Sequence, residues 1–389
     1  MAIPNWLGRA LARAQLDTIT FALTWAASDT ATVTINGKSI TYTAVGSSTT
    51  TAATALYTLL AASTITEFAA ITWANPSNGV ITATGTTAGV PFTLVASEVT
   101  AGNGTCAGVT TTAATGPNHW NNANNWDTGT VPVNGDTANV DLAIASIFWG
   151  LDQSAVTLAS LNITTSSFTQ NTLGLPRVNS SGYTEYLDQY LKISATAHRI
   201  NTKSPRVKVN FGTVVTTGEV QDTGSPPDGT TPAVLLLGTN TSNVFDVVQG
   251  TVGLAYYDGE SVNGSALTVG PAATVIVGTS GDFDSVTSSG TITYGGTGDE
   301  FQTAGGLAEI RGTPSFGLLD CNGGTTVCKF SGTVADVVVG PGRLDASQDN
   351  SARTFTDTML MKGGQIISPQ TINYTNGITL GPDVEQLTA

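Results

Sequence analysis

The residues of this chain best suited to catalysis are acidic side chains that lie close together in the sequence. Glycoside hydrolysis uses two carboxyl groups about 5 to 9.5 Å apart, one as acid and one as nucleophile or base. Four candidate pairs are present: Asp282/Asp284, Asp299/Glu300, Asp258/Glu260 and Asp345/Asp349. Their Gly, Ser and Asn surroundings are typical of solvated turns. We therefore expect no catalytic residue and keep Asp282 and Asp284 as the alternative pair.

Other catalytic chemistries lack the residues that they need. A nucleophilic triad requires a positioned base, and the two histidines, His119 and His198, have no suggestive neighbours. No Cys, His and carboxylate residues are spaced for zinc, and no phosphate-binding loop is present. We expect a protein that is not an enzyme and that needs no metal and no cofactor.

A basic segment interrupts an otherwise acidic chain. The formal net charge is −14, from 28 Asp and Glu against 14 Lys and Arg, which argues against a nucleic-acid partner. Residues 192–208 nevertheless contain five cations: Lys192, Arg199, Lys203, Arg206 and Lys208. Such a segment predicts either a docking surface for a partner subunit or a solvated loop.

All six tryptophans lie in the first 149 residues. Trp120 and Trp126 belong to the run N-H-W-N-N-A-N-N-W-D-T-G-T-V-P-V-N-G-D-T-A-N-V-D, residues 118–141. Bulky aromatic side chains at this position would cover the open apolar end of a stack of β-strands. The alternative is an exposed platform on which Trp120 and Trp126 stack against sugars. We favour the cover, and assign residues 118–155 to a Trp-rich cap.

The composition indicates a folded protein made mainly of β-strands. Hydrophobic residues make up 40% and charged residues only 11%, with 44 Gly between runs rich in Val, Ile and Thr, a pattern of short strands and turns. No apolar run reaches the ~18 residues of a membrane helix, so we expect no membrane insertion. Cys321 and Cys328 flank a short Gly-rich turn and form either a local disulfide or two reduced thiols; we favour thiols.

The first 117 residues predict three segments. Residues 1–16 have Ile3, Leu7, Leu11 and Ala14 at helical spacing and Pro4 in the first turn, which predicts a short amphipathic helix. Residues 17–100 predict an α+β attachment module, with a hairpin at Asn36-Gly37 and a helix over 49–62. The Gly- and Thr-rich residues 101–117 predict a linker or a flexible strand that leads into the Trp-rich segment.

Residues 156–389 predict a parallel β-solenoid body. Apolar strand-like runs recur throughout, and Gly-Thr-Val/Ile phrases begin at Gly250, Gly290 and Gly332. Their spacings of 40 and 42 residues equal two turns of ~20 residues in such a coil. The alternative is a β-sandwich or jelly roll, whose strands recur every 8–12 residues. The scarcity of charge and the Thr and Asn ladders favour the solenoid.

Two stretches resemble known proteins. The run T-V-T-I-N-G-K-S-I-T-Y-T-A, a Thr/Ala helix and G-V-I-T-A-T-G-T-T-A-G-V-P-F-T-L resemble small modules in virion proteins of tailed bacteriophages. The pattern W-x-x-x-x-N-W-x-x-G-x-x-P-x-x-G-D-x-A resembles the opening of β-solenoid regions in bacterial surface proteins, including autotransporter-like passengers. Its matching residues are Trp120, Asn125, Trp126, Gly129, Pro132, Gly135, Asp136 and Ala138.

These resemblances imply a structural role in a phage particle. We expect a non-enzymatic decoration, fibre or spike protein of the virion, with other virion proteins and copies of itself as partners, as a homotrimer or array. A host glycan is a further candidate partner. The alternatives are a tailspike depolymerase that cleaves host surface polysaccharide and a secreted bacterial adhesin located outside the cell or on its surface.

Overall fold

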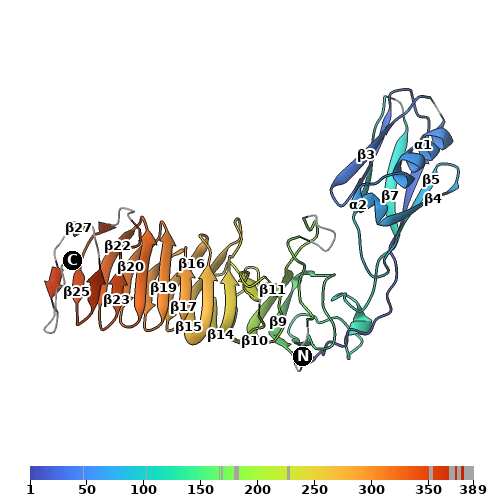
Figure 1. The fold of residues 1–389 in the computed structure, drawn as a ribbon. Helices are drawn as coiled ribbons and strands as arrows, with labels where there is room; N and C mark the ends of the chain where they lie inside the picture. Colours follow the sequence, from blue (N-terminus) through green and yellow to red (C-terminus); the bar gives the residue numbers. More distant parts are fainter. Residues whose placement is uncertain are drawn as a thin grey trace.

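The protein consists of a long parallel β-solenoid and a small domain beside one of its ends (Figure 1). The structure is a computed structural model. It describes residues 1–46, 48–101, 103–165, 167, 170–178, 184–225, 228–349 and 354–367, and the backbone of 373–374 and 378–380. The chain is 52% strand and 6% helix, and about 11 solenoid turns span residues 137–367. The prediction of a mainly β protein with a solenoid body is confirmed, and the β-sandwich alternative is wrong.

The small domain contains two antiparallel sheets and two helices. One sheet has the order β4-β5-β1-β7, from Ile71–Ser77, Val80–Gly85, Leu16–Ala22 and Thr105–Thr112. The other has the order β3-β2-β6, from Lys38–Thr43, Thr30–Ile35 and Leu94–Val99. The helices are α1, Thr49–Ala61, and α2, Thr66–Ala69. Their buried side chains form a core of their own, separate from that of the solenoid.

Local sequence explains the first half of this domain. Asn36 and Gly37 adopt φ angles of 48° and 82°, as a tight turn between two right-twisted strands requires. The Ser48 side chain accepts a hydrogen bond from the Thr51 backbone N–H and so caps α1, which buries Leu56 and Leu60. The predicted hairpin and helix are confirmed.

Of the two interpretations of residues 101–117, a linker or a flexible strand, the strand is confirmed over β7, Thr105–Thr112. Residues of β7 pair antiparallel with β1, for example Val109 with Thr18. As the last strand of its sheet, β7 exposes most of its side chains and buries Cys106. A rim strand of this kind needs little apolar alternation, so its Gly- and Thr-rich sequence is typical of a linker as well.

The predicted N-terminal helix over 1–16 is also wrong. This segment is extended and runs parallel to β8, Thr137–Asp141, with Asn5 opposite Asn139. Backbone bonds join Thr137 N–H to Ala2 O and Trp6 N–H to Asn139 O, at 3.1 and 2.9 Å. A helix would have left the edge of β8 without partners. Long-range strand pairing therefore overrides the local helical spacing.

The solenoid coils through parallel strands whose inward side chains stack from turn to turn. Phe245, Leu267, Val286, Phe301 and Leu319 occupy successive turns of one buried column. Its first strands after β8 are β9 Asp152–Thr164, β10 Leu191–Asn201, β11 Val207–Asn210, β12 Thr217–Asp222, β13 Val234–Leu237, β14 Val244–Leu254, β15 Val262–Val277, β16 Gly281–Ser288, β17 Thr291–Tyr294 and β18 Thr297–Thr303. The later strands are β19 Leu307–Gly312, β20 Ser315–Cys321, β21 Thr325–Phe330, β22 Thr333–Val339, β23 Arg343–Asp345, β24 Thr354–Phe355, β25 Met359–Met361, β26 Gln365–Ile367, β27 Asn373–Tyr374 and β28 Ile378–Leu380.

Only one of the two spacings between the Gly-Thr-Val/Ile phrases corresponds to two turns of the solenoid. Val252 pairs with Val275, which pairs with Ile292, so the first two phrases lie two turns apart in one column. The third phrase lies on a different face, where Val334 pairs with Phe316. Its spacing of 42 residues is therefore not a measure of two turns.

Candidate functional site

Three buried tryptophans close the first turn of the solenoid. Trp6, Trp120 and Trp126 are at most 1% exposed and belong to the solenoid core. Trp126 meets Trp6 and Trp120 edge to face, with ring centroids 5.2 and 4.8 Å apart. Its indole N–H donates to the Trp120 carbonyl oxygen at 2.8 Å. Because neither Trp120 nor Trp126 is accessible to a sugar, the platform hypothesis is wrong and these rings are cap residues.

Asn125 connects three segments of this cap. Its side chain is fully buried, and its Oδ1 accepts a hydrogen bond from the Ala10 backbone N–H at 2.7 Å. Its Nδ2 donates to the carbonyl oxygens of Gly116 and His119 at 2.9 and 2.8 Å. One side chain thus joins the N-terminal segment, the chain that leaves the small domain, and the Trp-rich segment. A buried amide with this many satisfied bonds is a strong structural constraint.

The remaining motif residues also serve the cap. Asp136 accepts hydrogen bonds from the backbone N–H groups of Ala2 and Val133 at 2.7 and 3.1 Å. Gly129 and Gly135 adopt φ angles of 68° and 84°, which only glycine adopts at low cost. Ala138 points into the core. The motif therefore describes how a solenoid end is closed.

The chain enters and leaves the small domain at one neck. Arg13 and Thr115 exchange backbone hydrogen bonds at 2.7 and 3.2 Å, and the Gly89 N–H donates to Arg13 O at 3.0 Å. The His119 Nε2 lies 2.9 Å from Gly89 O, and burial lowers the pKa of this imidazole. The small domain is therefore an insertion between the N-terminal segment, which contains Trp6, and the segment that contains Trp120 and Trp126.

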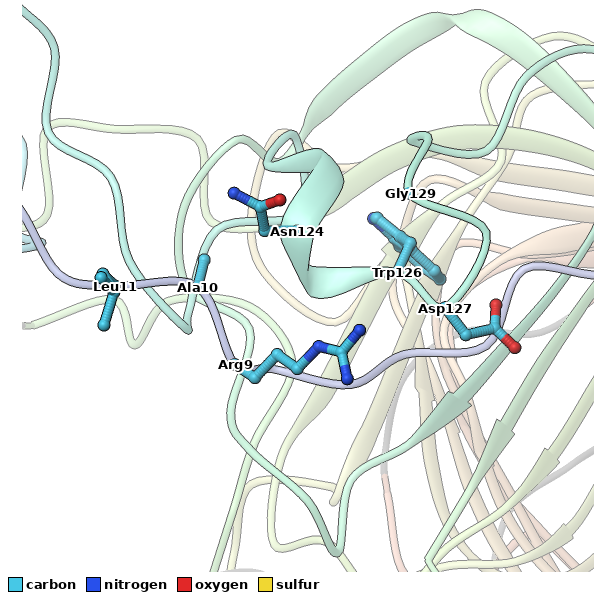
Figure 2. Close-up of a pocket in the computed structure, with 7 residues that line it drawn as sticks. All are labelled: Arg9, Ala10, Leu11, Asn124, Trp126, Asp127 and Gly129. Atoms are coloured by element: carbon cyan, nitrogen blue, oxygen red, sulfur yellow. The ribbon is translucent and has the colours of Figure 1, made fainter.

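A surface hollow of about 300 Å³ lies at this cap. Figure 2 shows Arg9 extending along it in the direction of Trp126 and Asp127. Asn5 donates to Asp127 from its backbone and side-chain N–H groups at 2.8 and 2.6 Å, and these bonds lower the pKa of Asp127. The hollow is lined by Arg9, Ala10, Leu11, Asn124, Trp126, Asp127 and Gly129. Its polar groups hold the N-terminal segment in place, and we assign it no ligand.

Two of the four sequence-derived carboxylate pairs lie on solenoid strands and not in an enclosed acid–base site. Asp282 and Asp284 lie on strand β16 rather than on a turn, and both are exposed on its outer face. The Asp282 carboxylate accepts a hydrogen bond from the Thr297 hydroxyl of the next turn at 2.9 Å. Asp299 and Glu300 likewise lie on a strand, β18. The expected turns at these pairs are therefore wrong, since alternate outward positions of solenoid strands accept charged residues.

A carboxylate pair from adjacent turns was missed by sequence reasoning. Glu219 on β12 pairs in register with Asp246 on β14, and neighbouring strands lie ~4.8 Å apart. Burial and then the Glu219 charge raise the pKa of Asp246. Gln221 donates to Glu219 at 2.6 Å and accepts from Arg199 at 2.6 and 2.9 Å. The loop within residues 221–232 lengthens this turn, so spacing gave no signal of the pair.

The five cations of residues 192–208 do not form one exposed strip. Lys192 pairs with Asp188 at 2.7 Å and Arg199 with Glu219 at 3.4 Å, while Lys203 pairs with Asp222. Arg206 is half-buried, and Lys208 is only 2% exposed. Strand alternation and the turn after β10 distribute these cations over different surfaces. The docking role stays a prediction for the exposed members.

Two other buried groups have structural explanations. Cys321 and Cys328 are buried on separate strands and are not joined by a disulfide, in agreement with the reduced interpretation, and burial raises the pKa of Cys321 to about 12. His198 lies inside the solenoid with its ring 4.7 Å from that of Phe211. Burial lowers the pKa of His198 to about 4, so this histidine is neutral at pH 7.

No protein-family model, curated protein or solved structure matches the chain. In the part of the chain that the structure describes, no group of three or more His, Cys, Asp or Glu residues is arranged to hold a metal ion. Of the described helices, none has the length and apolar character required to cross a membrane.

Proposed function

We propose that the protein is a non-enzymatic structural component of a bacteriophage particle, a decoration, fibre or spike protein of the virion. The small domain attaches it, and the solenoid projects as its exposed body. The observation that carries this proposal is the insertion of a domain with its own core at the capped end of a long solenoid (Figure 1). The phage setting rests on the resemblance of the small domain to virion modules.

The solenoid supports a mechanical role. One continuous core runs from Trp6 in the cap to Met361 in β25, so each turn is held by the turns on both sides. Hydrogen-bonded side-chain ladders reinforce the outer surface, as where Asn162 donates to Asn139 and Asn139 donates to Asn5, both at 2.9 Å. A stack of this kind resists bending and suits a projecting element.

The small domain supports an attachment role. It contacts the rest of the chain at the neck and through the Tyr186 hydroxyl, which donates to Pro91 O at 2.8 Å. Val95, Val99 and Val109 are exposed on β6 and β7, at the margins of its two sheets. Exposed apolar side chains on sheet margins favour contact with another protein.

The test is particle assembly with a variant that lacks the small domain. Residues 16–112 are replaced by a Gly-Ser linker, which the paired backbones of Arg13 and Thr115 allow. We expect electron microscopy of particles to show density for the full chain and none for the variant, although the variant folds. A full-length protein that adds no density to particles, or a variant that assembles equally well, would overturn the proposal.

A polysaccharide depolymerase is the second candidate, and the in-register pair Glu219 and Asp246 favours it. In-register residues of neighbouring strands lie ~4.8 Å apart, which is close to the carboxyl separation of ~5 to 5.5 Å in retaining glycosidases. Incubation of the full chain with capsular polysaccharide, followed by chromatography of released oligosaccharides, tests it. Release that Glu219→Gln and Asp246→Asn abolish, and that Asp284→Asn leaves intact, would support the enzyme. Absence of release supports the structural role.

A further inference from the structure

Three cations of the solenoid lie together without an ion pair. They are Arg177, Arg206 and Lys208, whereas Lys192, Arg199, Lys203, Arg311, Lys329 and Arg343 each lie within 4.0 Å of a carboxylate. Acidic residues outnumber basic ones by 28 to 14, so carboxylates are in ample supply. No carboxylate of the described residues lies within ion-pair distance of these three cations. That arrangement is expected where an anion is supplied from outside the chain.

Lys208 is the buried centre of this group. It points outward from β11 but is 2% exposed, because tyrosines cover it. Its ammonium nitrogen lies 5.3 and 5.4 Å from the ring centroids of Tyr190 and Tyr257. It donates to the side-chain oxygen of Gln189 at 3.1 Å. An ammonium has three donors, and within the described chain the other two have no acceptor.

The absence of a side chain at Gly174 in the neighbouring turn leaves space for Lys208. Gly174 has a φ angle of 94°, and a Cβ atom there would lie 2.9 Å from the Lys208 Cβ. Burial, and then the charge of Arg206, lower the pKa of Lys208 to about 8, while Glu260 raises it. Tyrosine rings recover only part of the cost of burying a cation. A further negative charge at this position would therefore stabilise the protein.

Arg177 forms the exposed rim of the group. Its guanidinium carbon lies 4.7 Å above the ring centroid of Tyr257, and a stacked guanidinium keeps its in-plane N–H donors free. Arg206 is fixed beneath, because its guanidinium donates to Gly174 O and the Thr172 hydroxyl at 3.1 and 3.0 Å. Glu260 accepts a hydrogen bond from the Tyr257 backbone N–H at 3.0 Å and so holds the stacked ring in place.

We propose that Arg177, Tyr257 and Lys208 form a binding site for the carboxylate of an acidic sugar. The planar guanidinium of Arg177 matches a planar carboxylate in a two-bond geometry, and Lys208 supplies charge from below. Tyr256 is half-buried with its ring 5.0 Å from that of Tyr257, and it offers an apolar surface to a pyranose ring. This inference goes beyond the proposed function and does not depend on where the protein assembles.

Isothermal titration of the full chain with trigalacturonate tests the site, with maltotriose and inorganic phosphate as comparison ligands. We expect binding of trigalacturonate alone, weakened by added salt. Arg177→Ala should weaken the binding of trigalacturonate at least tenfold. Arg177→Lys should give an intermediate affinity, because Lys keeps the charge but lacks the two parallel N–H donors of the guanidinium. Lys208→Met should also weaken it at least tenfold, whereas Lys192→Met, which removes an ion-paired cation, should leave it unchanged.

The variants separate a binding role from a structural one. Arg177 is exposed, so its replacement keeps the fold even if Lys208→Met does not. Failure of the wild-type chain to bind trigalacturonate would overturn the site, as would unchanged binding by Arg177→Ala. Equal binding of maltotriose would overturn the role of the carboxylate, and equal binding of phosphate would overturn the assignment to a sugar. Each result can be read without particle assembly.

Discussion

The small domain and the solenoid solve the problem of burying a core in different ways. The small domain joins antiparallel strands to α1 around a closed set of side chains that includes Trp25, Leu56 and Trp73. The solenoid repeats parallel turns, each of which exposes an apolar end until the next turn covers it. The first region is complete in itself. The second needs a cap, which it takes from Trp6 and Trp126 on the two sides of the inserted domain.

The order of the segments along the chain therefore differs from the order in which they stabilise one another. Residues 2–6 precede the small domain, yet their backbone hydrogen bonds are to β8 of the solenoid. Loss of the small domain should therefore leave the solenoid intact, whereas loss of the N-terminal strand should open its end.

Trp126→Ala should destabilise the solenoid by about 3 to 5 kcal/mol, as expected for the loss of a fully buried aromatic side chain. The rings of Trp6 and Trp120 lose their shared contact, so the first turn should open. Hydrogen-exchange mass spectrometry should show faster exchange in β8 and β9. Strands β1 and β5 of the small domain serve as the internal control, and equal loss of protection there would contradict two independent cores.

Acid should destabilise the solenoid through His198. The pKa of this buried imidazole is lowered to about 4, so the unfolded chain binds a proton between pH 6.5 and 4 while the native chain does not. Stability is therefore full above pH 6.5 and falls as the pH drops, by about 3 kcal/mol at pH 4. Urea unfolding of wild type and His198→Leu at both pH values measures the difference.

The comparison of the two proteins removes the contribution of the carboxylates, which titrate in both. His198→Leu should show a decline between pH 6.5 and 4 that is smaller by that amount. Both histidines, His119 and His198, lie outside residues 16–112, so the isolated small domain should lack this component. An identical decline in wild type and variant would show that His198 is not the group responsible.

Asn125→Ala should destabilise the cap by about 2 to 3 kcal/mol, because three buried hydrogen bonds to backbone groups are lost. The Ala10 backbone N–H donates a hydrogen bond to Asn125 Oδ1. Its protection from hydrogen exchange should fall first. Asn124→Ala is the matched control, since this neighbour is exposed. Equal effects of the two changes would contradict the role of Asn125 in the cap.

Much of the fold is predictable because its local signals agree with the long-range structure. The hairpin at Asn36-Gly37, helix α1 and the apolar solenoid strands all follow from local pattern. The N-terminal helix fails because the spacing of Ile3, Leu7 and Leu11 says nothing about the open edge of β8. Strand β16 was missed because Asp282 and Asp284 occupy outward positions that suit a turn equally well.

The candidate sites were harder to predict than the fold. The pair Glu219 and Asp246 forms only when a loop of irregular length brings two turns into register. Lys208 reads as part of a basic segment, and its burial depends on Tyr190 and Tyr257 from other segments. Both sites arise from contacts between distant residues, for which a single sequence offers no periodic signal.

Excision of residues 16–112 should have the smallest effect of all, less than about 1 kcal/mol on the unfolding of the solenoid. Arg13 and Thr115 are already paired through their backbones, so a short Gly-Ser linker closes the chain without strain and adds little loop entropy. The bonds of Gly89 to Arg13 and His119 and the Tyr186 bond to Pro91 are lost, but all three lie at the margin of the solenoid. Urea unfolding of the excised chain and of the isolated small domain gives both stabilities, and their curves should combine to reproduce that of the full protein. A solenoid that loses several kcal/mol on excision would show that the inserted domain supports the cap.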